Sequence, residues 1–433
     1  MFRCQIILGW TYLLAATTTI VGSDAAAAAN SDLVRGFSLT EIEGHLYDAS
    51  MDEDHKTEAQ IIVDKLYDLG VRQINLSPRA TMTDPIGNEL IPSTPPSDRG
   101  NERQRYSRLI NYIHEKGMRV GIRPIFFVVD RAGHTPYVQI LPDGTKKSWW
   151  HGNIQPQDPD KWFESYGTYL DIYETIAKMN RVEEFTIGAE LYSMTVGIED
   201  QWPAYPYGFP GPWLALLQHA RNRLGAAARI MYDINFTDDK ATSGGLDEYG
   251  GEFARWRYRL VDLANNSDPG QQVIWADLAR FWRGLDAVGI DLYRSLASEN
   301  APLPSGFDAL VALLSQTSDR YASQIDNALT EIQGAVGQPK NVILKEVGYR
   351  SVTRGFVTPF VYAGTGTLNL EHQAAAYAAT LHSFWGMGWP WFKGIVFWDT
   401  SVDSSRHGPL DIGFSPIGKE PTEAVLREFF VDQ

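Results

Sequence analysis

The stretch FTIGAELYSM, residues 185–194, places a glutamate at the end of an apolar run that has the alternation of a β-strand. With a period of two residues, Phe185 and Ile187 fall on one face of the strand, and Gly188 and Glu190 fall on the other. The run is too apolar for an ordinary surface strand. We therefore expect Glu190 to end a buried strand and to project into the space beyond it.

Apolar runs of this kind recur along the chain, separated by amphipathic stretches that are typical of helices. Eight such runs begin at Val34, Val71, Arg119, Glu183, Arg229, Ala287, Asn341 and Lys393. Helical stretches such as RQRYSRLINYIHEKG and PWLALLQHARNRLG end at Gly, which often follows the last turn of a helix. Eight β-then-α units predict a protein of the α/β class, a single (β/α)8 TIM barrel with extended βα loops. A doubly wound open sheet is the alternative.

The chain has 433 residues, of which 44% are hydrophobic and 21% are charged, which is enough to form one large core. Residues 1–29 have the features of a signal peptide: an early positive charge, an apolar stretch too short to span a membrane comfortably, and the small residues AAAAA at 25–29. We expect this leader to be cleaved, leaving one secreted domain over residues 30–433; a signal anchor is the alternative. The only cysteine, Cys4, lies in the leader, so the mature chain would have no disulfide.

The formal net charge of −15 argues against polyanionic partners, because phosphate binding needs clustered Lys and Arg. We expect no nucleic acid partner, no membrane contact after the leader is removed, and a monomer. The sequence contains no HExxH, no GxSxG elbow and no P-loop, and its nine histidines are scattered. We therefore expect no metal and no cofactor.

In a barrel of this kind, catalytic residues gather at the C-terminal ends of the strands. The polar and aromatic candidates at those ends are Asn75, Arg123, Asp130, His134, Glu190, Asp233, Asn235, Asp291, Tyr293, Glu346, Tyr349, Trp398 and Asp399. An Asp or Asn that ends a strand is commonly a turn or helix cap. Glutamate is a poor cap, so Glu190 and Glu346 stand apart from the others.

Glu190 and Glu346 end the fourth and seventh predicted strands, which lie on opposite sides of an eight-stranded barrel. Two facing carboxyl groups suit glycoside hydrolysis, in which one holds a proton for the leaving oxygen and the other stays ionised as nucleophile or base. Tyr293, at the end of the sixth strand, is expected to donate a hydrogen bond to Glu346 and to help keep it ionised. The alternative is a pair of salt-bridged core glutamates.

The segments GAELYSM, GIDLYRSL, KEVGYRS and GFSPIGKEPTEAVLREFF resemble glycoside hydrolase family 113, and the resemblance runs over nearly the whole mature chain. It implies a retaining β-mannanase-like barrel in which Glu190 is the acid/base and Glu346 the nucleophile. Retention predicts a carboxyl separation of about 5 to 5.5 Å.

Two positions bear on the preferred sugar, which stays open. Family 113 is part of a larger clan of barrels whose acid/base and nucleophile lie on strands 4 and 7, and much of that clan has an Asn before the acid/base that contacts the sugar 2-hydroxyl. This chain has Ala189 at that position, and family 113 also lacks the Asn. Lys345 stands where the family often has a hydroxyl residue. By parity Lys345 should point away from Glu346, unless a bulge brings its ammonium close enough to lower the pKa of the glutamate.

Aromatic residues are abundant, with 13 Trp, 20 Tyr and 19 Phe, and flat rings suit the apolar faces of pyranoses. We predict Trp398 as the floor of the site, although core packing is the alternative for any single Trp. The other predicted substrate-binding residues are Trp150, His151, Asn75, Asn235 and Arg123. Asn75 and Asn235 are also sequons, with turn capping as the alternative role, and Asn265 is the sequon expected to accept a glycan.

The predicted function is a secreted retaining glycoside hydrolase that cleaves β-linked polysaccharide, above all β-1,4-mannan or a related β-hexosan, with two glutamates. The alternative is a non-catalytic carbohydrate-binding or interaction protein on the same barrel. The two opposed carboxylates favour the enzyme, because a binding protein has no need of them.

Overall fold

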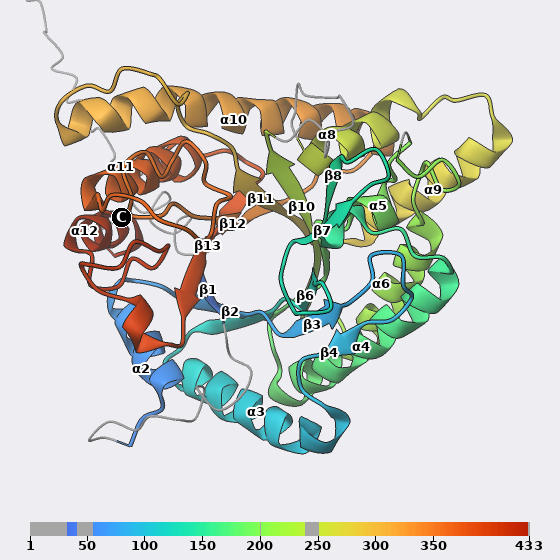
Figure 1. The fold of residues 1–433 in the computed structure, drawn as a ribbon, viewed down its shortest axis with the longest axis horizontal. Coiled ribbons are helices and arrows are strands. Elements are labelled where there is room, and N and C mark those ends of the chain that lie inside the picture. Colours follow the sequence, from blue (N-terminus) through green and yellow to red (C-terminus); the bar gives the residue numbers. More distant parts are fainter. Residues whose placement is uncertain (1–32, 41–54, 200, 239–250, 432–433) are drawn as a thin grey trace, which may run out of the picture.

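The computed structural model describes residues 33–40, 55–199, 201–238 and 251–431, and its centre is a barrel of parallel strands surrounded by helices (Figure 1). The barrel strands are β1 (Val34–Thr40), β2 (Gln73–Leu76), β5 (Arg119–Ile122), β9 (Glu184–Ala189), β10 (Arg229–Thr237), β11 (Ala287–Tyr293), β12 (Val342–Val347) and β13 (Phe392–Ser401). They close in the order β1-β13-β12-β11-β10-β9-β5-β2. Closure confirms the predicted (β/α)8 TIM barrel and excludes the open sheet.

A helix follows each barrel strand on the outside. These helices are α2 (Glu58–Asp68), α3 (Arg99–Glu115), α4 (Pro159–Asn180), α6 (Pro210–Leu224), α9 (Pro269–Gly284), α10 (Phe307–Val336), α11 (Leu370–Leu381) and α12 (Glu420–Phe430). Four of them, α2, α4, α9 and α11, begin at a side-chain cap: the Asp158 side chain, for example, accepts a hydrogen bond from the Lys161 N–H just before α4. None of the helices in the described part of the chain is long and apolar enough to cross a membrane.

The loops carry several short elements. They are α5 (Tyr192–Thr195), α8 (Gly251–Arg257), the hairpin strands β7 (Tyr137–Ile140) and β8 (Lys146–Trp149), 3₁₀ turns at Pro96–Asp98, His151–Asn153 and Ser404–Arg406, and π-helical turns at Tyr258–Asp262 and His382–Gly386. The extended βα loops of the prediction are therefore present, notably the hairpin after β5.

The third predicted strand is divided in two. Its first half is β5, but its second half, β6 (Ile125–Val128), leaves the barrel and pairs with β3 (Arg79–Met82), which also pairs with β4 (Ile91–Pro92). The division falls at Pro124, which has no N–H for a ladder hydrogen bond. One continuous strand was the wrong prediction here.

The strand β12 contains one extra residue at Lys345. Leu344 pairs with Ile290 and Glu346 pairs with Asp291, so the register of β12 on β11 shifts at Lys345. The fully buried Lys345 ammonium contacts the Glu184 carboxylate inside the barrel. The bulge that the sequence analysis considered at Lys345 therefore exists. The side chain, however, contacts Glu184 and not Glu346.

The predicted signal peptide at residues 1–29, with Cys4, lies outside the described residues. Its cleavage stays a prediction.

Candidate active site

Glu190 follows β9 directly and has a backbone φ of 55°, in the left-handed region that non-glycine residues rarely adopt. Its N–H donates to the Asp233 carbonyl at 2.9 Å, and the next N–H, of Leu191, donates to the Tyr232 hydroxyl at 3.0 Å. Such a conformation costs about 1 to 3 kcal/mol, and these two hydrogen bonds hold it in place. The residue is 8% exposed, so it is buried with a small part of its surface open to solvent.

The Glu190 carboxyl group has two hydrogen-bonding neighbours. Asn235 donates from Nδ2 to Oε1 at 2.6 Å, and Nε2 of His151 lies 3.2 Å from Oε2. Burial raises the pKa of Glu190, but the contacts with His151 and Asn235 outweigh burial, and the pKa lies below its usual value.

Glu346, on β12, is also 8% exposed and has different neighbours. Its Oε2 accepts a hydrogen bond from the Tyr293 hydroxyl at 2.9 Å, which is the contact expected from the sequence. Its Oε1 contacts Nη1 of Arg123. Burial raises the pKa of Glu346 to about 7, and the Glu190 charge adds to this, whereas Arg123 and Tyr293 act in the opposite direction.

Arg123 is fully buried and joins three carboxyl groups. Besides Glu346, it donates from Nε to Asp233 Oδ2 and from Nη2 to Asp291 Oδ2, each at 2.7 Å. Strand-end Asp residues were expected to be caps, but these two bind the guanidinium. Burial raises the pKa of Asp291 well above its usual value, and the Arg123 guanidinium acts in the opposite direction.

The two glutamates interact electrostatically, since the Glu190 charge is among the causes that raise the pKa of Glu346. Two interacting carboxyl groups titrate as a pair, and their protons belong to the pair. Near neutral pH the pair shares one proton. It is shared between Glu346, which contacts the Arg123 guanidinium, and Glu190, which contacts the Asn235 amide and the His151 imidazole.

The two predicted aromatic residues lie on different elements, Trp398 on β13 and Trp150 in the loop before the turn His151–Asn153. Trp398 is partly exposed on β13, one residue beyond the pairing of Phe397 with Val347 of β12. The Trp150 ring, also partly exposed, lies 4.7 Å from the His151 ring and 5.7 Å from the Tyr192 ring, centroid to centroid. The Trp150 ring therefore offers flat apolar surface beside His151, which contacts Glu190.

Gly152 makes this packing possible, because a Cβ there would fall 2.7 Å from the Trp150 ring and 2.6 Å from the Tyr192 ring. The same turn places His151 against Glu190.

Asn75 does not join this group. It has no exposed surface, and it accepts a hydrogen bond from Gln73 at 3.0 Å inside the barrel. Asn235 is 4% exposed and holds Glu190, whereas Asn265 is exposed in the loop before α9. Among the three sequons, Asn265 has the accessibility that a glycan needs.

Glu252 of α8 is a supporting residue that the sequence did not reveal. It is fully buried and accepts hydrogen bonds from Tyr232 and Trp256 at 2.9 Å and from the Asn235 N–H at 3.3 Å. Burial raises its pKa to about 8. Glu252 thus contacts two of the residues that hold Glu190.

The fold and a family match connect the chain to known proteins. Residues 44–205, which include Glu190 but not Glu346, match the model of Glycoside Hydrolase Family 113. No curated protein matches the chain. A GH113 β-mannanase from Alicyclobacillus acidocaldarius, solved in complex with ManMIm, is 17% identical, with a TM-score of 0.59 over 92% of this chain and 97% of that one. A GH113 β-1,4-mannanase is 15% identical, with a TM-score of 0.59 over 93% and 100%.

Structural likeness at this level of identity establishes the barrel, and the family match relates residues 44–205 to the glycoside hydrolases of family 113. The resemblance expected from the sequence is thereby confirmed: the chain is a glycoside hydrolase similar to family 113.

Proposed function

We propose that the chain is a retaining glycoside hydrolase that cleaves β-linked polysaccharide, above all β-1,4-mannan, by double displacement. One observation carries the proposal: two buried glutamates lie at the ends of β9 and β12, three positions apart around one barrel, and of the two only Glu346 contacts a permanent cation. A nucleophile must stay ionised until it attacks, and Arg123 with Tyr293 favours that form.

In the first step, Glu346 attacks the anomeric carbon while Glu190 gives a proton to the leaving oxygen. In the second step, Glu190 removes a proton from water, which displaces Glu346 from the sugar. Arg123 and Tyr293 orient the Glu346 carboxylate, and Asn235 and His151 orient Glu190. Both glutamates therefore meet the sugar from fixed positions.

The proton of the pair must lie on Glu190 before the first step, although the contacts of Glu190 favour its ionised form. The two placements of one proton have the same net charge, so a modest new interaction can exchange them. The glycosidic oxygen of a bound substrate is an acceptor, and an acceptor beside Glu190 favours the protonated form. Substrate binding thus prepares the acid.

Mannan is the preferred substrate in this proposal because the structural neighbours with TM-scores of 0.57 to 0.59 are β-mannanases, one of them in complex with ManMIm. Trp398 and Trp150 supply the flat surfaces that pyranose rings pack against. Other β-linked hexosans are the alternatives.

The direct test incubates the purified protein with a panel of β-linked mannans, glucans and galactans, and measures reducing ends and product length. We expect the fastest release from β-1,4-mannan, with mixed oligosaccharides if cleavage is internal. The matched control is the double variant Glu190→Ala/Glu346→Ala, which detects contaminating activity. Binding to mannan without release of reducing ends would support the non-catalytic alternative.

We also propose that the chain is exported and acts as a monomer. The secreted protein should begin between about Asp24 and Ser31, because signal peptidases cut after small residues. Sequencing of its N-terminus tests export, and retention of Met1 in a membrane fraction would favour an anchor.

A further inference from the structure

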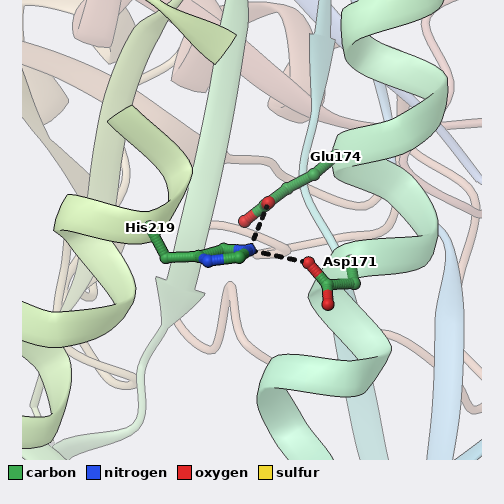
Figure 2. Close-up of side chains that lie close together, drawn as sticks. All are labelled: Asp171, Glu174 and His219. Carbon is green, nitrogen blue, oxygen red and sulfur yellow. Dashed lines mark hydrogen bonds and ion pairs between the residues drawn. The ribbon is translucent and has the colours of Figure 1, made fainter. Parts of the chain in front are cut away.

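A second group of charged side chains lies outside the barrel, between α4 and α6. Figure 2 shows Asp171 and Glu174 of α4 pointing toward His219 of α6. Nε2 of His219 lies 2.8 Å from Asp171 Oδ1 and 3.4 Å from Glu174 Oε2. One ligand-type atom from each residue fits within 4.8 Å of the others. The spacing of three residues puts both carboxyl groups on one face of α4.

Glu174 distinguishes this group from an ordinary surface ion pair. The residue is only 1% exposed, and its Oε2, which points at His219, has no hydrogen-bond partner in the described part of the chain. Burial raises the pKa of Glu174 to about 7, even though His219 and Arg223 act in the opposite direction. A buried carboxyl oxygen without a hydrogen bond is costly, and a bound cation removes that cost.

The two outer residues leave the group accessible. The His219 side chain is 51% exposed and the Asp171 side chain 45% exposed, so an ion has a path from solvent to Glu174. The group is therefore buried at Glu174 and open to solvent at Asp171 and His219.

We propose that Asp171, Glu174 and His219 form a zinc site that joins α4 to α6. Zinc accepts one imidazole nitrogen and two carboxylate oxygens at about 2.0 to 2.2 Å, with water as a fourth ligand. Calcium and magnesium prefer sets made of oxygen alone, so the imidazole favours zinc.

Arg223 is the competitor of the ion. Its Nη1 lies 3.4 Å from Asp171 Oδ1 and its Nε 3.7 Å from Glu174 Oε2. The guanidinium supplies part of the positive charge that zinc would bring, and like charges repel. Arg223→Gln should therefore bind zinc more tightly than the natural chain, a result that a purely internal ion pair does not predict.

The site would brace the helices on either side of β9, the strand that leads to Glu190. Helix α4 precedes β9 and α6 follows it, and the two helices contact each other. We expect zinc here to raise thermal stability and to leave the reaction at the barrel mouth unchanged.

The experiment titrates the full-length, chelator-treated protein with Zn²⁺ alone, by calorimetry and by thermal unfolding. The natural chain is used throughout, so that the rate of the reaction at the barrel mouth can be measured with and without zinc. We expect one zinc ion per chain and a Tm increase of about 3 °C at a zinc concentration 100-fold above Kd. His219→Gln and Asp171→Asn should lose both effects, and both should keep the circular dichroism of the parent protein.

The matched control is His134→Gln. His134 forms an exposed pair with Asp130, Nδ1 to Oδ2 at 2.9 Å, and among the described residues this pair belongs to no three-ligand group. This variant should bind zinc like the parent. Equal zinc binding by the parent and His219→Gln, or no binding by the parent at 100-fold excess over the protein, would overturn the proposal.

Discussion

The ends of β9 and β12 carry the same side chain in two different settings. The Glu190 backbone lies in the left-handed region, and its carboxyl group contacts the Asn235 amide and the His151 imidazole. Glu346 sits beside a bulge and is held by a guanidinium and a phenol. In the proposed mechanism, the two carboxyl groups differ in role because their neighbours differ, since both belong to glutamate residues.

The largest expected effect is that of Glu346→Ala. Without the nucleophile, kcat should fall by roughly 10⁴-fold or more on every substrate, because no other group is placed to form the covalent intermediate. Steady-state rates on mannan and on an aryl β-mannoside measure the effect, with Glu346→Gln as a control of similar shape. A kcat within tenfold of the parent value would mean that Glu346 is not the nucleophile.

Glu190→Ala should have an effect that depends on the leaving group. Mannan, whose leaving alcohol needs a proton, should react roughly 10³-fold more slowly, while the first step with a dinitrophenyl mannoside should be nearly unchanged. Pre-steady-state release of dinitrophenol separates the two steps. Equal losses on both substrates would mean that Glu190 is not the acid.

Tyr293→Phe tests the donors around Glu346. Loss of the hydroxyl removes a hydrogen bond to the ionised form, so the pKa of Glu346 should rise further above about 7. The acidic limb of the kcat/KM profile, which requires ionised Glu346, should move to higher pH, and for a rise of about one pKa unit activity at pH 6 should fall by about fivefold more than activity at pH 8. An unmoved limb with a lower Tm would leave Tyr293 only a packing role.

Glu252→Gln should have the smallest effect on activity. Glu252 contacts Tyr232 and Asn235, which hold Glu190 at the end of β9. The pKa of Glu252 is about 8 in the folded chain, above its ordinary value, so the stability it contributes is present at low pH and is lost as pH rises through about 8. Gln imitates the protonated form, so the Tm of the variant should fall less between pH 6 and pH 9. Activity should change only a few-fold. Parallel Tm curves for the variant and the parent would show that Glu252 does not keep its proton.

The sequence predicted the barrel because parallel strands buried on both faces read as apolar runs. It also predicted Glu190 and Glu346, because a glutamate that ends such a run is unusual. The division of the third strand was signalled by Pro124 and was still missed. The bulge at Lys345 has no local signal, since it depends on how β12 pairs with β11.

Other features of the site arise only when distant segments meet. Glu252 looks like one acidic residue in a short helix, and its importance comes from contact with Tyr232 and Asn235 of β10. Asp233 and Asp291 looked like caps until the fold placed Arg123 between them. The periodicity of a sequence indicates which face of a strand is buried, but it does not indicate which charged side chains meet inside a barrel.

The most direct test of the two roles is the configuration of the product formed when azide rescues each variant on a dinitrophenyl β-mannoside. Azide should attack from the face vacated by Glu346 in Glu346→Ala and give the α-mannosyl azide. In Glu190→Ala it should attack the covalent intermediate and give the β-mannosyl azide. Proton NMR of the two products decides: this pair of anomers is predicted, and the opposite pair, or no rescue in either variant, would contradict the assignment of Glu346 as nucleophile and Glu190 as acid/base.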